Sequence, residues 1–498
     1  MAISKGRFAE KALLFAFLLM GFSFSVTQTL MARELLVSFA GNELSIGLVL
    51  GSWLILEAMG SGLLGRLAER VRAKAPSYAA LQLAFTLLLP LALYAAFTVR
   101  SIVGVMPGEG LSLVSILYSS FLILTPLGLV DGAMFTFGCK AYSRLVPKEI
   151  RSIGNVYVLE AVGGIVGGLV FTYLFIPYLH SVQVILVLAA LNLASAASLL
   201  ALNPEHKAAG SRASLAIVLI LLAASLGFLL SPQANAIHRW IAQQQWRGYE
   251  LAFYRNSIYG NIAVIRQGEQ YTFFANGVPI LTTPVPDITL VEELVHLPML
   301  FVSQPRQVLV VSGGVGGVLN EILKYPVDRV DYAELDPLLI KAVQDLPTPL
   351  TAKELADPRV EIEHVDGRLL VKRKGWEAHP NYDLIVLNLP YPSTLQLNRF
   401  YTKEFFHMVR AIMDERGVLV LLSPGTLTYM SPAMRNLNAA IYETLKEAFP
   451  HVRPIPGDVN LWLASPGQAV EEVPLDELVR RWEERAVPAS LVTDFHIR

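Results

Sequence analysis

The C-terminal half of the chain places glycines and acidic residues directly after apolar segments that have the pattern of buried β-strands. The segment "QVLVVS" (307–312) is followed by four glycines, namely Gly313, Gly314, Gly316 and Gly317. Glu334 lies near the end of the next segment, "VDYAEL" (330–335), and Asp366-Gly367 follow the third, "VEIEHV" (360–365). Because the carboxyl ends of parallel strands share one edge of a sheet, we expect these residues to form one site.

The types of these residues favour a nucleoside ligand. Glycine allows the backbone to approach a ligand and to turn tightly into a helix N-terminus. Glu334 can accept hydrogen bonds from both ribose hydroxyls, and Asp366 can accept one from an adenine amino group. We therefore predict an adenosine-type ligand. The alternative is that these residues only preserve the turns of the fold.

The elements that would position this site alternate between strand-like and helix-like patterns. Two further strands are expected at "YDLIVLNL" (382–389) and "GVLVLLS" (417–423), with helices at 317–325 and 337–346. Such alternation predicts a parallel α/β sheet with helices on both faces.

A small β-domain is expected before this sheet. Its strands are predicted at "GNIAVIRQ" (260–267), "YTFFANG" (271–277) and "VPILTT" (278–283), with a hairpin turn at Asn276-Gly277. A helix then follows at "VEELVHLPML" (291–300).

The N-terminal half is apolar enough to cross a membrane repeatedly. Hydrophobic residues make up 53% of the 498 residues and charged residues 16%, and few of the charges precede residue 231. A span needs about 20 mostly apolar residues and must be helical in lipid. Seven segments qualify, at 12–31, 44–64, 78–98, 114–137, 156–178, 182–202 and 215–230.

Basic residues in the short loops predict the orientation. The N-terminal tail and the second, fourth and sixth loops carry Lys5, Arg7, Lys11, Arg66, Arg70, Arg72, Lys74, Lys140, Arg144, Lys148, Arg151, Lys207 and Arg212. The opposing loops carry only Arg33 and Arg100. We therefore predict a multi-pass protein of a bacterial or archaeal cell membrane with a cytoplasmic N-terminus. Seven spans then place the region after Leu230 outside the cytoplasm.

The membrane half contains an internal repeat. "LEAMGSGLLG" (56–65) on the second span is similar to "LEAVGGIVGG" (159–168) on the fifth, as expected for a duplicated three-helix unit of inverted topology. Six helices in this arrangement resemble half of a major facilitator superfamily transporter in topology. Half a transporter cannot rock against a second bundle, which favours a fixed anchor or a dimer.

Three acidic residues lie on the predicted spans. Glu57 and Glu160 occupy equivalent positions of the repeat near the expected midplane, and Asp131 lies on the fourth span. Acidic residues are costly in a bilayer and point to function, so we predict a proton, cation or amine site. The alternative is a hydrogen-bonded structural role where glycines allow helices to approach closely.

Composition offers no nucleic-acid or metal partner. The net charge is −1, and the chain has one cysteine, Cys139, and nine scattered histidines. We therefore predict no metal site and no nucleic-acid binding. The lipid bilayer is the expected partner, with a homo-oligomer or a membrane complex as further possibilities.

Residues 257–465 resemble spermidine synthase, the aminopropyltransferase family. The resemblance is carried by "EELVHLPML" before "QVLVVSGGVGG", by "AELD" (333–336), by "VDGR" (365–368) and by "YDLIVLNLPYPSTLQLNRFYTKEFF" (382–406). It implies a Rossmann-like methyltransferase-type domain with a small N-terminal β cap. It also implies S-adenosylmethionine or its decarboxylated form as cofactor, putrescine or a similar amine as acceptor, and Asp336 among the cofactor-binding residues.

The sequence departs from this family where acids would hold the amine. Asn388 stands where the resemblance implies the catalytic aspartate, and Tyr391 where it implies a second aspartate. An asparagine cannot act as a carboxylate base. The remaining replacements are Val315 for a loop aspartate, Gly260 for a glutamine, and Leu290 or Val291 for a tyrosine. We therefore expect adenosyl binding without transfer to putrescine, or a catalytically inactive pseudoenzyme that serves as a scaffold or accessory subunit.

Two less favoured functions remain open. The residues Asn388-Leu389-Pro390-Tyr391 resemble the Asn-Pro-Pro-Tyr motif of amino-group methyltransferases, where the asparagine holds the target amine. A transporter role would rest on the three acidic residues of the spans.

The predicted organisation is a membrane domain (1–232), a linker (233–256), a small β-domain (257–284), a synthase-like Rossmann domain (285–467) and a helical tail (468–498). Within the tail, "LDELVRRWEERA" (475–486) has the pattern of an amphipathic helix for partner contact or for packing on its own domain.

Overall fold

The computed structural model describes residues 2–70, 75–144, 149–202, 209–376, 381–470 and 473–498. The chain forms two compact units, which we describe separately. Unit 1 comprises Met1–Ala263 and Ala275–Val278, and unit 2 comprises Val264–Phe274 and Pro279–Arg498. Of the basic loop residues used to predict orientation, Arg72, Lys74, Lys148 and Lys207 lie outside the described residues.

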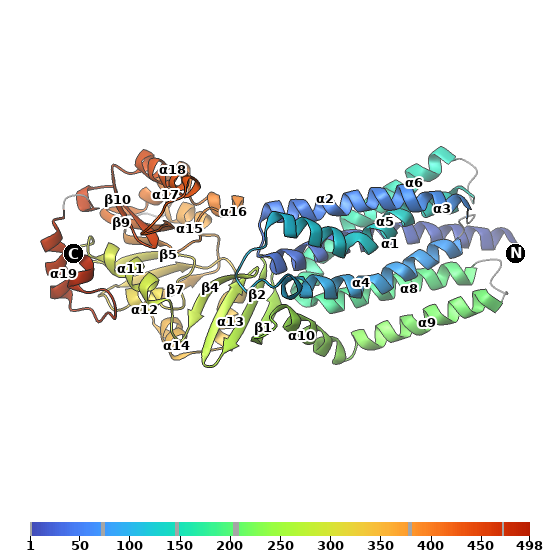
Figure 1. Cartoon of the computed structure of the whole chain (residues 1–498), viewed down its shortest axis with the longest axis horizontal. Helices are drawn as coiled ribbons and strands as arrows, with labels where there is room; N and C mark the ends of the chain where they lie inside the picture. Colours follow the sequence, from blue (N-terminus) through green and yellow to red (C-terminus); the bar gives the residue numbers. More distant parts are fainter. Residues whose placement is uncertain (1, 71–74, 145–148, 203–208, 377–380, 471–472) are drawn as a thin grey trace. The chain divides into compact units, whose positions relative to one another are not determined.

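Unit 1 is a bundle of long apolar helices (Figure 1). Within the described residues, seven helices are long and apolar enough to cross a membrane, which confirms the predicted spans. They run over Phe8–Phe39, Glu43–Ala68, Ala75–Val103, Leu113–Ser143, Ile153–Tyr178, Ser181–Leu202 and Arg212–Leu229. The last span is the shortest, with 18 residues, and most of its side chains are not buried. It therefore adds little to the core of the bundle.

These spans correspond to the labelled helices of Figure 1. Their bounds are α1 Ala2–Phe39, α2 Glu43–Met59, η1 Gly60–Leu64, α3 Gly65–Arg70, α4 Ala75–Val103, α5 Leu113–Ser143, α6 Glu149–Val170, η2 Phe171–Phe175, α7 Ile176–Tyr178, α8 Ser181–Leu202 and α9 Ala209–Leu229.

Glycines bring α2 and its extension η1 against α5 at backbone contact. A Cβ on Gly132 would lie 1.9 Å from the carbonyl oxygen of Glu57, and one on Gly60 would lie 2.3 Å from that of Leu129. A side chain at either position would force the two helices apart, so the approach depends on glycine.

Helices α1 and α6 approach each other through glycines in the same way as α2 and α5. A Cβ on Gly21 would lie 1.8 Å from the carbonyl oxygen of Glu160, and one on Gly163 would lie 1.9 Å from that of Leu18. Gly60 and Gly163 follow Glu57 and Glu160 by three residues in the repeated sequence. The second helix of each three-helix repeat therefore packs on the first helix of the other repeat.

A helix and a strand occupy the predicted linker. Helix α10 spans Gln233–Gln245, and β1 spans Glu250–Asn256. β1 opens a four-stranded sheet of order β1-β2-β3-β4, whose other strands are β2 Asn261–Gln267, β3 Gln270–Ala275 and β4 Val278–Thr283. The sheet thus begins at Glu250, before the predicted boundary at 257.

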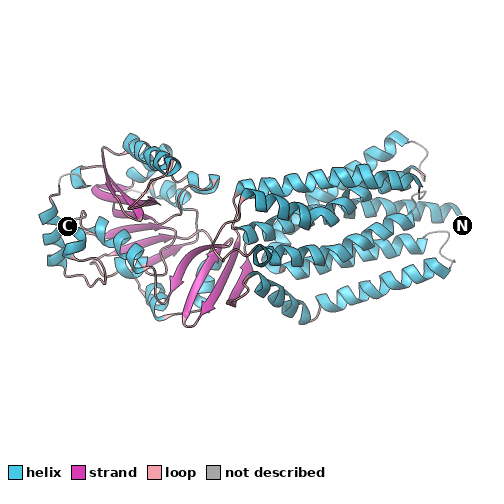
Figure 2. Ribbon diagram, viewed as in Figure 1, coloured by secondary structure: helices cyan, strands magenta, loops and turns pink. Residues whose placement is uncertain are grey.

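Unit 2 is built on a seven-stranded mixed sheet of order β10-β11-β9-β8-β5-β6-β7 (Figure 2). The strands are β5 Gln307–Val311, β6 Arg329–Ala333, β7 Val360–Glu363, β8 Tyr382–Leu387, β9 Met413–Pro424, β10 His451–Ile455 and β11 Val459–Ser465. Strands β9, β8, β5, β6 and β7 are parallel, which confirms the α/β prediction. Two further strands that the sequence did not predict make the sheet mixed, because β11 pairs antiparallel with both β9 and β10.

Helices cover this sheet and complete its core. They are α11 Ile288–Met299, α12 Val318–Ile322, α13 Pro337–Asp345, α14 Pro349–Ala356, α15 Gly367–Lys374, α16 Leu395–Asn398, α17 Lys403–Arg410, α18 Pro432–Ala448, α19 Leu475–Arg485 and α20 Asp494–Ile497. α17 packs against α15 and α18, and α12 packs against α11 and α14. Phe405, Phe406 and Leu419 are fully buried between these layers.

The C-terminal tail packs on unit 2. Arg481 Nη1 in α19 donates to the carbonyl of Leu300 at 2.9 Å, and Arg485 Nη1 donates to that of Met299 at 2.5 Å. Trp482 is buried and its ring meets His296 edge-on at 5.4 Å. Of the two roles expected for this amphipathic helix, these contacts provide domain packing.

Candidate functional site

The predicted glycine loop follows β5 and has a backbone that favours glycine. The φ angles are +57° at Gly313, +94° at Gly316 and +123° at Gly317, and Ser312 also has a positive φ of +61°. L side chains rarely adopt these angles. Val315, which stands where the resemblance implies an aspartate, is buried with 2% of its surface exposed.

Glu354 on α14 binds the backbone of this loop. Its carboxylate accepts hydrogen bonds from the N–H groups of Gly316 at 2.8 Å, Gly317 at 2.7 Å and Asn320 at 3.1 Å. Glu354 has no exposed surface. Burial raises its pKa to about 7, although the three N–H groups favour its ionised form. The backbone N–H groups at the start of α12 therefore bind the Glu354 carboxylate, a side chain of the same domain.

Tyr332 links the first half of the loop to Glu334. Its hydroxyl donates to Glu334 Oε2 at 2.7 Å and interacts with the backbone N–H groups of Gly314 and Val315. A Cβ on Gly314 would lie 2.9 Å from the Tyr332 ring, so this glycine is needed for the contact.

Glu334 lies just beyond the carboxyl end of β6, beside the loop, as expected. It is 5% exposed, and burial raises its pKa while the hydrogen bond from Tyr332 opposes that rise. Its Oε1 accepts a long bond of 3.4 Å from the N–H of Asp336, and the carboxylate also interacts with the N–H of Leu335. Asp336 itself caps α13, accepting from the N–H of Leu338 at 3.0 Å.

Asp366 and Gly367 lie at the start of α15. Asp366 Oδ1 accepts from the N–H of Leu369 at 3.1 Å, and its Oδ2 pairs with Arg399. A Cβ on Gly367 would lie 2.3 Å from Val311 Cγ1. Both residues therefore have contacts within unit 2. Arg399 pairs with the carboxylate of Asp366, which was predicted to accept a hydrogen bond from adenine.

Asn388 follows β8 and contacts the glycine loop directly. Its Nδ2 donates to the carbonyl oxygen of Gly313 at 2.8 Å. Because a carbonyl oxygen can only accept, the atom that faces it must be the amide nitrogen. Tyr391, three residues later, is 51% exposed. Tyr401, which lies in the same segment, donates a hydrogen bond to the carbonyl of Pro390 at 3.1 Å.

Sequence reasoning missed Tyr332 and Glu354. Tyr332 precedes Glu334 by two residues, so a strand period of two places both on one face, and this signal was available. Glu354 gave no such signal, because α14 is short and lies in a stretch that had no predicted element.

The acidic residues of the spans lie together in unit 1. Asp131 is 2% exposed, and its Oδ2 accepts from Trp53 Nε1 at 3.0 Å. Its Oδ1 is buried and has no hydrogen-bond partner among the residues that the structure describes. Glu57 and Glu160 are half-buried and interact electrostatically with Asp131.

Glu292, His296 and Glu321 form a buried cluster that the sequence did not predict. Their ligand atoms lie within 4.8 Å of one another. Glu292, however, accepts from three consecutive N–H groups, those of Ser490, Leu491 and Val492 at 2.6, 2.8 and 3.0 Å. Burial raises the pKa of Glu292, but these three bonds outweigh it and leave a net lowering.

Glu321, the second acid of this cluster, also has a partner. Glu321 pairs with Lys324, and His296 Nδ1 lies 2.9 Å from the Tyr325 hydroxyl. A cation would have to displace these partners. The cluster therefore fits a clamp on the C-terminal segment better than a metal centre.

Comparison with known proteins identifies the class of the C-terminal part. Residues 289–466 match the family model of the spermine/spermidine synthase domain. Residues 289–466 are thus similar to the spermine/spermidine synthase domain, and the resemblance seen in the sequence is confirmed for this region.

The individual relatives are polyamine aminopropyltransferases. That of Korarchaeum cryptofilum is 34% identical over 197 residues, which cover 39% of this chain and 60% of that protein. That of Oceanobacillus iheyensis is 28% identical over 282 residues, or 54% of this chain and 52% of that protein. The match thus spans about half to three fifths of these relatives' length. The solved spermidine synthase of Thermotoga maritima has a TM-score of 0.41 and 22% identity, covering 50% of this chain and 82% of that one.

Proposed function

We propose that the synthase domain binds an adenosyl sulfonium, decarboxylated S-adenosylmethionine or S-adenosylmethionine, at the carboxyl edge of β5 and β6. The observation that carries the proposal is Glu334, a buried carboxylate beside the glycine loop whose Oε1 accepts a long hydrogen bond of 3.4 Å from the N–H of Asp336. A ribose hydroxyl would supply a shorter hydrogen bond to this oxygen. Tyr332 holds the other oxygen and fixes the carboxylate in place.

The chemistry of such a donor requires an acceptor with a free electron pair. An amine nitrogen would attack the carbon beside the sulfonium, the carbon–sulfur bond would break, and its electron pair would leave on a neutral thioether. The nitrogen must then lose a proton. Asn388 cannot take that proton, and its amide is engaged with Gly313. We therefore propose that the acceptor is not putrescine.

Calorimetric titration of the full chain in detergent tests this proposal. The ligands are S-adenosylmethionine, its decarboxylated form and methylthioadenosine. Binding of at least one is expected, with an affinity that falls about tenfold or more in Glu334→Gln, since one charge-assisted hydrogen bond is lost. Glu443→Gln, on the exposed face of α18, is the matched control. Absence of heat with every ligand at millimolar concentration would refute the proposal.

A scaffold without catalysis is the second candidate for this domain. It is favoured by the internal partners of the site, since Glu354 holds the N–H groups of Gly316 and Gly317 and Arg399 pairs with Asp366. The same titration separates the candidates, because a scaffold needs no adenosyl ligand. An amine methyltransferase would instead bind S-adenosylmethionine in preference to the decarboxylated form.

For unit 1 we propose a cation or amine site at Asp131, flanked by Glu57 and Glu160. The buried Oδ1 of Asp131 supports it, because an unpaired carboxyl oxygen in a span is costly. Asp131→Asn keeps an oxygen for Trp53 while removing the charge. Thermal unfolding in detergent should show stabilisation of the wild type, but not of this variant, by putrescine relative to choline. Equal shifts in both proteins would contradict the site.

A further inference from the structure

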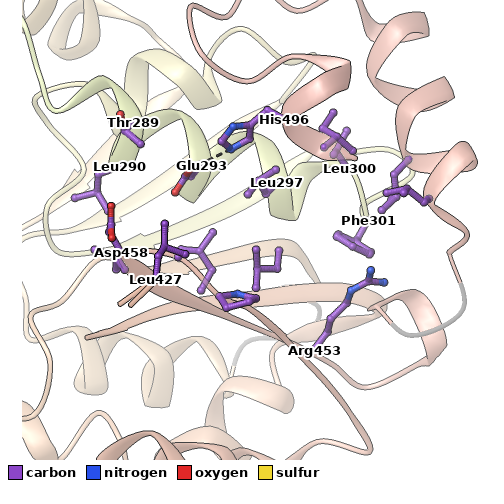
Figure 3. Close-up of a pocket in the computed structure, with 18 of the residues that line it drawn as sticks. Thr289, Leu290, Glu293, Leu297, Leu300, Phe301, Leu427, Arg453, Asp458 and His496 are labelled. Carbon is purple, nitrogen blue, oxygen red and sulfur yellow. Dashed lines mark ion pairs between the residues drawn. The ribbon is translucent and has the colours of Figure 1, made fainter. Parts of the chain in front are cut away.

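A cavity of about 610 Å³ lies in unit 2 alongside α11 (Figure 3). Its walls come from α11 and the turn after it, from the edge strand β10 and its neighbour β11, and from α19 and α20 of the tail. Most of the lining is apolar, including Leu290, Leu297, Phe301, Leu461, Leu475 and Leu478. A volume of this size accommodates a small organic ligand.

The polar groups of this cavity are distributed along its length. Asp458 lies at one end, near Leu290, and Arg453 lies at the other, where its guanidinium is 5.2 Å from the Phe301 ring (Figure 3). Between them, Glu293 pairs with His496 at 3.1 Å. One end is thus acidic and the other basic, and the middle holds the Glu293–His496 pair among apolar side chains.

The acidic end of the cavity lies at the edge of the sheet where the adenosyl ligand is proposed. Leu290 belongs to the first turn of α11, and a Cβ on Gly317 would meet Val291 of the same turn at 3.1 Å. Asp458 precedes Val459, which pairs with Pro424 at the carboxyl end of β9. The basic end points away from this edge, along α11.

Apolar side chains are exposed on the loops that follow β8 and β9. Tyr391 and Leu395 follow β8, and Leu427, Tyr429 and Met430 follow β9. Leu427 is 71% exposed and also lines the cavity. Of these residues Leu427 borders the cavity, and an exposed apolar side chain at a pocket mouth favours an apolar ligand.

We infer that the acceptor of this domain is a monoamine with an extended apolar body, such as an arylalkylamine, rather than a polyamine. Its ammonium group would lie at the acidic end beside Asp458, and its apolar body would extend between α11 and β11. A second ammonium group would approach Arg453 and be repelled. This inference rests on the proposed function for the reaction, but the binding it predicts can be measured without a donor.

The experiment uses the full chain in lipid nanodiscs and measures affinity by calorimetry. The probes are phenylbutylamine, phenylbutanol and putrescine, with methylthioadenosine titrated separately. Phenylbutylamine is expected to bind about tenfold or more tightly than either of the other two, since each lacks one of the two required features. Asp458→Asn and Leu427→Asn, both at exposed positions, should each weaken phenylbutylamine binding severalfold and leave methylthioadenosine unchanged. Glu443→Gln should change neither.

Each outcome decides one claim. If phenylbutanol binds as well as the amine, or if putrescine binds as tightly, the inferred acceptor class is wrong. If methylthioadenosine binds but no amine does, the proposed adenosyl site stands and the inference falls. If the arylalkylamine binds with the expected variant effects but no adenosyl ligand does, the cavity is a separate amine site and the proposed function falls.

Discussion

Asn388 and Glu354 hold opposite sides of the glycine loop, one through a carbonyl oxygen and the other through N–H groups. The amide of Asn388 donates to Gly313, and the carboxylate of Glu354 accepts from Gly316 and Gly317. A carboxylate at position 388 could not donate this bond. The residue that replaces the implied catalytic aspartate is therefore matched to the loop conformation beside it.

We predict that Asn388→Asp destabilises unit 2 and restores no transfer to putrescine. The new carboxylate would face the Gly313 carbonyl, and loss of this part-buried donor costs about 1–3 kcal/mol. Urea denaturation of the full chain in detergent measures the effect. Asn398→Asp introduces the same charge at an exposed position of α16 and should change stability little. A variant as stable as the wild type would contradict the role given to the Asn388 amide.

Glu354 should make the stability of unit 2 fall as the pH rises from about 4.5 to about 7. Its pKa is raised to about 7 in the folded state, so across this window the folded chain retains a proton that the unfolded chain releases. The contribution is present below the lower pH and is lost by the upper one, and amounts to about 3 kcal/mol at most.

Glu354→Gln should remove this component of the pH dependence. The check is the unfolding free energy of both proteins between pH 4.5 and 8, with Glu443→Gln as control. Parallel curves for the wild type and Glu354→Gln would show that the carboxyl does not titrate in this range.

At the scale of elements, close helix contacts in unit 1 depend on single glycines. Gly60 and Gly132 allow α2 with η1 to meet α5, and Gly21 and Gly163 allow α1 to meet α6. Gly62 lies in the same η1 turn as Gly60, yet a Cβ there would meet no atom within 4 Å. The repeat therefore contains both contact glycines and glycines without a packing role.

We expect Gly132→Ala to lower the thermal stability of the membrane unit, because the new methyl group would collide with the Glu57 carbonyl and separate the helices. The loss should be about 1–3 kcal/mol, as for overpacked cores. Gly62→Ala is the matched control and should be neutral or slightly stabilising. Equal melting temperatures in detergent for both variants would refute the close contact.

The elements differ in how well the sequence predicts them. The spans and strands β5, β8 and β9 were predictable because each contains a continuous apolar run, and β6 and β7 because they alternate with helical segments. The edge strand β10 was not, since "HVRPI" contains a proline and a charged residue that suit an edge. At the site, Glu334 and Asp366 lie at their strand ends as predicted. The strand period of two could also have assigned Tyr332, whereas Arg399 reaches Asp366 from a separate segment that periodicity does not place.

For the whole molecule, the number of spans and the proposed cofactor predict opposite sides of the membrane for the synthase-like domain. Seven spans with a cytoplasmic N-terminus place the synthase domain outside the cytoplasm, whereas adenosyl sulfonium cofactors are expected inside. The two units are each compact, so neither fold by itself decides the side. The location of the C-terminus does.

Arg498→Cys should react with a membrane-impermeant maleimide in intact cells, because the seven spans predict an external C-terminus. The wild type, whose single cysteine is the half-buried Cys139, gives the background. Labelling that requires permeabilised cells would overturn the predicted orientation and place the domain with its proposed cofactor.

The matching glycine registers of unit 1 also fix which residues correspond between its halves. Because Gly21 and Gly132 make equivalent contacts, Met20 is the counterpart of Asp131. Met20 carries a thioether where Asp131 carries a carboxyl, so only one of these two corresponding positions bears a charge.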